Sequence, residues 1–264
     1  MRFLVLGPLG TQVGGGPQTA PGARKLRSLL AYLCIHSGQV VSTARLTAAL
    51  WPDAPPRTAP TALHVYVSKL RQYLHAQSSG MAAALATCAP GYRLDLADHQ
   101  LDLRQFEFLV GRAEEHRSHQ RTEKAAAALN SALALWRGHA LADLRTLPVF
   151  ESLGRRLDER YTFACMRHFE VELELGNHQG IIGELRSLVA ERPTWESPYE
   201  YLMLALYRSG RAVEALDAYR ELRSTLVQGL GVEPGPQVRR LHRAVLSHDP
   251  CLAPARPGGL RPVP

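Results

Sequence analysis

Hydroxyl, amide and cationic side chains recur at helical spacing in the segment between Arg57 and Leu74. At about 100° per residue they share one face of a single helix. An α-helix fits the major groove of B-DNA, where such side chains hydrogen-bond to base edges and phosphates. The spacing therefore predicts a helix that reads double-stranded DNA. Its outward positions are Thr61, His64, Val65, Ser68, Lys69, Arg71 and Gln72.

The opposite face of this helix is apolar and should be its core face. Pro60 suits the first turn, because the missing N–H is not needed there. Apolar residues then recur at helical spacing, which is typical of a helix packed on one side. They are Leu63, Tyr66, Val67, Leu70, Tyr73 and Leu74.

Other basic residues are placed to hold phosphates. Arg57 and Thr58 directly precede the helix, and Arg24 and Lys25 begin an earlier helix whose N-terminus attracts anions. Arg93 could enter the minor groove or hold a phosphate. The alternative for these residues is a solvated surface position with no partner.

A hairpin follows the helix, at residues 85–96. Its turn is Ala89-Pro90-Gly91, after which Tyr92, Leu94 and Leu96 alternate with Arg93 and Asp95, as in a half-buried strand. The order helix then hairpin is that of a winged helix-turn-helix.

Upstream elements complete this order. Residues 3–13 predict a strand pair, and Arg24–Ser37 predict a helix that stops at Gly38. Val40-Val41 is extended, and Ser42 caps a second helix that ends at Trp51-Pro52. This is an N-terminal α+β head.

Positive charge is concentrated in the same part of the chain. Residues 1–96 carry nine Lys and Arg against two acids, whereas residues 97–248 carry twenty against twenty-one. A basic head on a near-neutral body is typical of a polyanion-binding domain joined to a domain with another partner.

Residues 97–248 are predicted to be helical almost throughout. The segments 173–188 and 206–222 resemble each other at an offset of 34 residues, with Gly176 matching Gly210. That period is typical of tetratricopeptide repeats, which stack helix pairs into partner-binding surfaces. The predicted helices cover residues 103–117, 122–137, 147–175, 179–191, 196–209, 212–228 and 235–247.

The predicted fold class is therefore mainly α, with three parts. A winged-helix head covers residues 1–96, an all-α tetratricopeptide-like domain covers 97–248, and a Pro/Gly-rich tail, expected to be disordered, covers 249–264.

Other classes of function find no support in the sequence. Four scattered cysteines and eleven histidines show no metal-ligand spacing, and no HExxH, GxSxG, GxGxxG or phosphate-binding loop is present. We expect no cofactor, no metal, no catalytic residues and no membrane segment. We interpret MRFLVLGPLG as a strand rather than an export signal, and expect a cytoplasmic protein with reduced thiols.

Several motifs in order resemble the Streptomyces antibiotic regulatory proteins across about residues 1–248. They are MRFLVLGPLG, ARKLRSLLAYL, VVSTARLTAALWPDAPPRTA, ALHVYVSKLRQYL, PGYRLDL, ALALWRG and ALYRSGRAVEALDAYRELRSTLVQGLGVEPGPQVRRLH. The resemblance implies an OmpR-type winged helix followed by a bacterial transcriptional activator domain. It places the recognition helix at Thr61–Leu74 and the wing tip at Pro90-Gly91-Tyr92-Arg93, which adds Tyr92 to the candidate DNA contacts.

The resemblance also implies partners and a role. Its members activate secondary-metabolite gene clusters by binding direct repeats near the promoter −35 element, as two protomers side by side, and recruit RNA polymerase holoenzyme. Many carry amides where this chain has Thr61 and His64, so the repeat sequence is not transferable. From the residues alone, a repressor and a protein-interaction adaptor with a winged-helix head remain alternatives.

Overall fold

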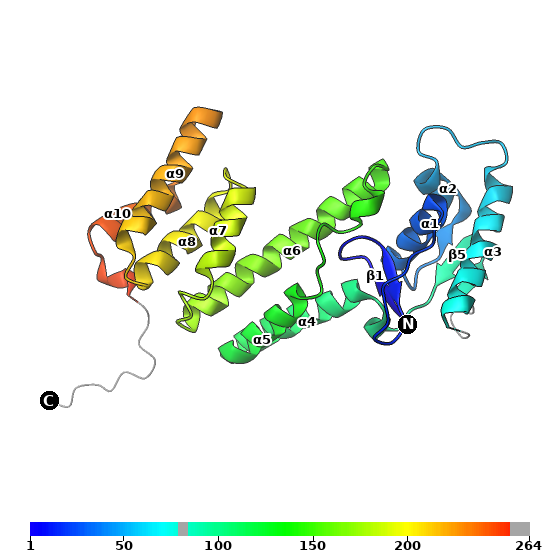
Figure 1. Cartoon of the computed structure of the whole chain (residues 1–264), viewed down its shortest axis with the longest axis horizontal. Coiled ribbons are helices and arrows are strands. Elements are labelled where there is room, and N and C mark those ends of the chain that lie inside the picture. Colours follow the sequence, from blue (N-terminus) through cyan, green and yellow to red (C-terminus); the bar gives the residue numbers. More distant parts are fainter. Residues whose placement is uncertain (79–83, 254–264) are drawn as a thin grey trace. The chain divides into compact units, whose positions relative to one another are not determined.

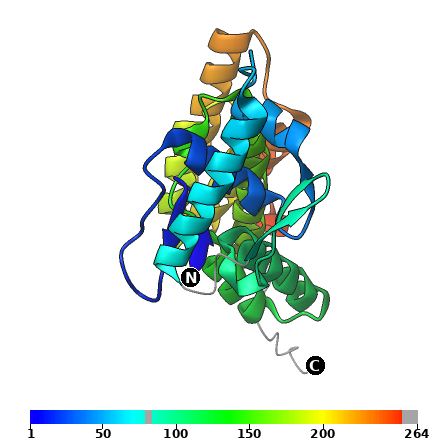
Figure 2. The same ribbon diagram turned by 90° about the vertical axis from the view of Figure 1, so that its right-hand side faces the viewer.

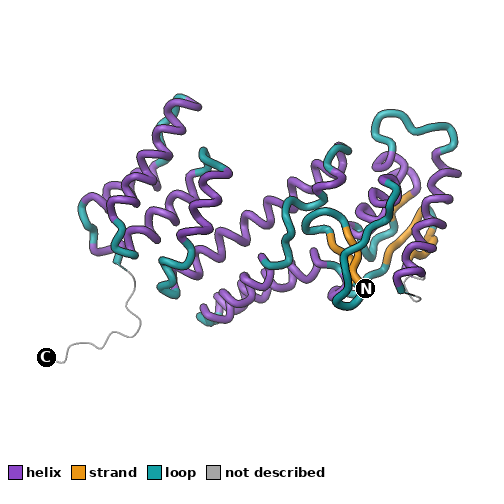
Figure 3. The backbone as a smooth tube through the Cα atoms, viewed as in Figure 1, coloured by secondary structure: helices purple, strands orange, loops and turns teal. Residues whose placement is uncertain are grey.

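The computed structural model describes residues 1–78 and 84–253. The described chain is mainly helical, and its short strands all lie in the N-terminal head, as predicted (Figures 1 and 3). Contacts divide it into two compact units. The first unit contains Met1–Glu115 and Ala127–Ala164, and the second contains His116–Ala126 and the described residues from Cys165 on.

Two small sheets form in the head. Strand β1 (Arg2–Leu4) pairs antiparallel with β2 (Gly10–Gln12), which confirms the predicted strand pair. The second sheet has β5 (Gly91–Leu94) in its centre, with β3 (Val41–Ser42) and β4 (Leu85–Cys88) on either side. Strands β4 and β5 are the predicted hairpin.

Three helices pack on these sheets. They are α1 (Arg24–Ile35), α2 (Thr43–Leu50) and α3 (Ala59–Gln77). The Ser42 hydroxyl accepts a hydrogen bond from the Arg45 N–H at 3.2 Å, which is the predicted N-cap of α2. The core face of α3 is also as predicted, because Leu63, Val67 and Leu70 are buried. Burying each such side chain contributes about 1.5–3 kcal/mol.

Helices follow to the end of the described chain and match the predicted segments within a few residues. They are α4 (Asp102–Ser118), α5 (Thr122–Leu133), α6 (Pro148–Glu174), α7 (Ile182–Glu191), α8 (Glu196–Arg208), α9 (Ala212–Leu230) and α10 (Pro236–Leu246). The matched glycines of the repeat have equivalent backbone conformations, with φ of +81° at Gly176 and +76° at Gly210. Each ends a helix in the left-handed region that favours glycine.

The segment expected to be disordered starts with an ordered turn. Pro250–Leu252 form a 3-10 turn, in which the Asp249 carboxylate accepts a hydrogen bond from the Cys251 N–H at 2.8 Å. Arg208 Nε also donates to the Leu252 carbonyl at 2.9 Å. These bonds fix the turn. The rest of the predicted tail, residues 254–264, lies outside the described residues.

The first unit extends beyond the predicted head. Asp102, at the start of α4, has a side chain that is 1% exposed and accepts hydrogen bonds from the Val5 and Leu6 N–H groups at 2.9–3.0 Å. Leu141 N–H donates to the Gly7 carbonyl at 2.7 Å. The predicted boundary after residue 96 marks the change from strand to helix, whereas the compact units divide within 97–248.

We expect Asp102→Ala to lower the free energy of unfolding by about 3 kcal/mol or more, because two buried N–H groups lose their acceptor. Chemical denaturation at neutral pH measures this loss. The matched control is Asp98→Ala, which removes only an exposed ion pair with Arg104 and should cost under about 1 kcal/mol. Equal losses in the two variants would contradict the assigned role of Asp102.

We also expect Gly91→Ala to destabilise the protein by at least about 2 kcal/mol. A Cβ at this position would overlap the Val41 carbonyl and lie 2.7 Å from the Ser42 Cα, so β3 could not pair with β5. Thermal and denaturant unfolding report the change. Gly15→Ala is the control, since nothing lies within 4 Å of a Cβ there, and a comparable loss in that variant would rule out close strand approach as the cause.

Candidate nucleic-acid interface

The outer face of α3 is open to solvent and lies beside the hairpin (Figure 2). Val65 is 47% exposed, so even the apolar member of this face is not needed by the core. Six of the seven predicted outward positions are exposed. They are Thr61, His64, Val65, Ser68, Lys69 and Gln72.

Arg71 is the exception, because its side chain is half-buried between α3 and the hairpin. Its Nε donates to the Leu85 carbonyl at 3.0 Å, and a terminal nitrogen donates to the Thr87 hydroxyl at 2.8 Å. The guanidinium fixes β4 against α3. The structure therefore corrects the expectation of an outward-pointing side chain: Arg71 positions the hairpin.

Tyr92 also differs from expectation. Its side chain points inward from β5 and the residue is 2% exposed, which leaves the ring in the core rather than on the wing surface. The reason is the alternation of β5, whose buried positions include Tyr92 and Leu94. The Tyr92 hydroxyl lies 2.7 Å from His64 Nδ1 and orients that exposed imidazole on α3.

Several of the predicted phosphate-holding cations have partners within the protein. Arg93 pairs with Asp95 at 2.8 Å, and this pairing raises the pKa of the guanidinium. Lys25 donates to the Leu50 carbonyl and lies 5.0 Å from the Trp51 ring centroid. Burial, and then the charge of Arg24, lower the pKa of Lys25.

Arg24 donates to the Thr146 hydroxyl, yet its residue is exposed. Arg57 and Thr58 are exposed in the loop that leads into α3. The sequence from residue 54 to residue 94 contains no Asp or Glu, so this loop, α3 and the strands β4 and β5 carry no carboxylate side chain. The electrostatic potential of this surface therefore favours polyanions.

Arg45 was not among the predicted contacts. It is exposed on α2, and one guanidinium nitrogen lies 3.3 Å from His36 Nε2 and 3.4 Å from the Tyr32 hydroxyl. Its signal in the sequence is that it is the one basic residue of residues 43–50. It adds a cation to the helix that precedes α3.

Metal sites, disulfides and membrane-spanning helices are absent from the described residues. Within residues 1–78 and 84–253, no group of three His, Cys, Asp or Glu side chains is placed to hold a metal ion. All four cysteines are free. No helix in this described part is both long enough and apolar enough to cross a membrane.

Two family models match the chain. The model for the transcriptional regulatory protein C-terminal domain matches residues 18–94, and the model for the bacterial transcriptional activator domain matches residues 101–246. The first match contains α3 and the hairpin, so the exposed face belongs to a DNA-binding winged helix.

Relatives share both parts. Regulatory protein DnrI of Streptomyces peucetius is 36% identical over 257 residues, which cover 96% of this chain and 94% of DnrI. Regulatory protein AfsR of Streptomyces coelicolor is 36% identical over 254 residues, covering 96% of this chain and 25% of AfsR.

A solved structure is also similar. Mycobacterium tuberculosis EmbR in complex with a low affinity phosphopeptide superposes with a TM-score of 0.88 at 35% identity. The match covers 94% of this chain but 65% of EmbR, so this chain spans about two thirds of that relative. With an OmpR-type winged helix followed by a bacterial transcriptional activator domain, the chain belongs to the Streptomyces antibiotic regulatory protein family, whose members are transcription regulators rather than enzymes.

Proposed function

We propose that this protein is a sequence-specific activator of a secondary-metabolite gene cluster, which binds direct repeats near the promoter −35 element. Two protomers bind side by side, and the helical region recruits RNA polymerase holoenzyme. The observation that carries the proposal is the exposed face of α3, free of carboxylates and held beside the hairpin by Arg71.

The side chains divide into two proposed roles. Thr61, Ser68 and Gln72 are exposed hydroxyl and amide groups that read base edges, and His64 joins them in the orientation that Tyr92 sets. Phosphate contacts come from cations around the face, which fix the register without reading sequence. We assign them to Arg24, Arg57, Lys69 and Arg93, and also to Arg45, which is exposed on α2.

The relatives support the regulatory part of this proposal. DnrI matches along nearly its whole length and is a regulatory protein of a Streptomyces species. EmbR was solved with a low affinity phosphopeptide, and this chain covers 65% of EmbR. A repressor shares the same DNA-binding surface, and only a transcription assay separates the two roles.

We expect Lys69→Ala to weaken binding to duplex DNA and to reduce the salt dependence of affinity by about one unit of slope. Lys69 is exposed on α3, and no hydrogen bond or ion pair holds its ammonium within the described residues. Fluorescence anisotropy on a GC-rich duplex, over a series of salt concentrations, measures both quantities. Lys124→Ala, an exposed lysine on α5, is the matched control, and an equal response in that variant would refute the assignment of Lys69 to phosphate.

Selection of genomic fragments on the purified protein at near-physiological salt tests the target. We expect enrichment of a spaced direct repeat, which Thr61→Ala together with Gln72→Ala should abolish while nonspecific affinity persists. In transcription reactions with RNA polymerase holoenzyme, adding the protein should raise the yield of transcript from the selected promoter. A lower yield would identify a repressor, and binding without any sequence preference would favour the adaptor.

A further inference from the structure

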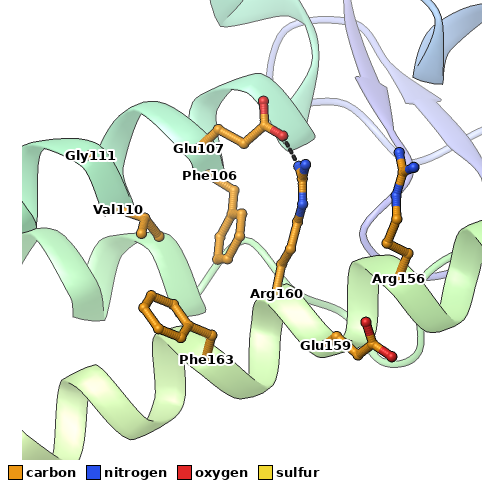
Figure 4. Close-up of a pocket in the computed structure, with 8 residues that line it drawn as sticks. All are labelled: Phe106, Glu107, Val110, Gly111, Arg156, Glu159, Arg160 and Phe163. Carbon is orange, nitrogen blue, oxygen red and sulfur yellow. Dashed lines mark hydrogen bonds and ion pairs between the residues drawn. The ribbon is translucent and has the colours of Figure 1, made fainter.

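A cavity of about 600 Å³ opens between α4 and α6 within the first unit (Figure 4). One end is apolar and the other is charged. The lining residues are Phe106, Glu107, Val110 and Gly111 from α4, and Arg156, Glu159, Arg160 and Phe163 from α6. The DNA-binding surface described above uses none of them.

Gly111 keeps space open over the apolar end. It lies in the interior of α4, where glycine costs about 1 kcal/mol relative to alanine. A Cβ at Gly111 would meet nothing within 4 Å, so packing within the protein does not require a glycine. Gly154 on α6 differs, because a Cβ there would lie 2.9 Å from the Ala140 carbonyl. The absent side chain at Gly111 instead leaves room for something outside the chain.

Phe163 presents aromatic surface to this space. The residue is 51% exposed, and Figure 4 shows its ring directed towards Val110 and Phe106 across the cavity. Phe106 is 2% exposed and packs edge-on against Trp136 with ring centroids 5.4 Å apart. The apolar end therefore has a fixed inner wall and a half-exposed ring on its rim, and a ligand that removes more of this ring from water gains from burial.

Arg156 lies at the other end, where Glu159 also lines the cavity. Arg160, one turn further along α6, pairs with Glu107. By contrast, no carboxylate of the described residues forms an ion pair with Arg156. The charge of Arg156 also acts on His36. Burial first, and then the charges of Arg45 and Arg156, lower the pKa of His36. A guanidinium with open donors binds carboxylates and related anions well.

We propose that this cavity is a binding site for a small amphipathic organic anion. Its aromatic or polycyclic body lies over Gly111 and against Phe163, and its carboxylate or sulfonate accepts hydrogen bonds from Arg156. The volume is within the range of about 300–1,000 Å³ that small-molecule sites occupy. The site goes beyond the proposed DNA-binding role and does not depend on it.

The test uses the full chain and the fluorescent probe 1-anilinonaphthalene-8-sulfonate, which combines a polycyclic body with one negative charge. We expect saturable binding, which Gly111→Leu abolishes by filling the space and Arg156→Gln weakens about tenfold. The acid 2-naphthoate should displace the probe about tenfold better than its neutral amide. This preference for the acid should disappear in Arg156→Gln.

Matched variants separate the site from general effects. Arg155→Gln removes the adjacent arginine, which pairs with Glu151 at 2.7 Å and does not line the cavity, and should leave probe affinity unchanged. Gly111→Leu improves helix propensity, so its melting temperature should not fall. Absence of saturable binding of the probe would overturn the proposal, and so would a probe affinity that neither Gly111→Leu nor Arg156→Gln changes. The cavity would then be a candidate contact for a protein partner instead.

Discussion

The buried Asp102 carboxylate determines how the N-terminal strands and the helices that follow them are joined in the first unit. It accepts backbone hydrogen bonds from Val5 and Leu6 and lies 3.6 Å from Arg137. Burial raises the pKa of this carboxyl, and the two N–H donors and Arg137 act against that shift. A carboxylate removed from water is stable only where hydrogen-bond donors replace the water. The backbone N–H groups that follow β1 must therefore stay beside Asp102.

The same constraint explains why the strand pair stays attached to helices. The carbonyl of Leu6 accepts from Arg137 N–H at 2.9 Å, and the Leu9 N–H donates to Asp143 at 2.8 Å. A two-stranded sheet is marginal in water because half of its backbone groups lack partners. Here residues of the helical region form hydrogen bonds with the backbone of the loop that joins β1 to β2. The head and the first helices after it consequently form one compact unit, although the sequence changes character between them.

Local pattern was sufficient to predict the α-helices of the described residues and the hairpin, because apolar spacing and caps such as Ser42 act over a few residues. The hydrogen bonds that position the DNA-binding surface were not predictable in that way. Arg71 reaches Leu85, and His64 meets Tyr92 across 28 residues, so both contacts depend on how the hairpin packs against α3. A helical wheel assigns Arg71 to the outside, whereas the acceptors on β4 draw its guanidinium against the hairpin.

Such internal hydrogen bonds and ion pairs reduce the number of cations in the head that are available to DNA phosphates. Arg71, Lys25 and Arg93 already have acceptors within the protein, so a phosphate would have to compete with them. Lys69 and Arg57 are exposed without such partners in the described chain and lose no bond on contact. The number of phosphates bound should therefore be smaller than the net charge of the head, since each released counterion requires a cation that is free to turn outward. In return, a hairpin already fixed by Arg71 needs no ordering when DNA arrives, which lowers the entropic cost of binding.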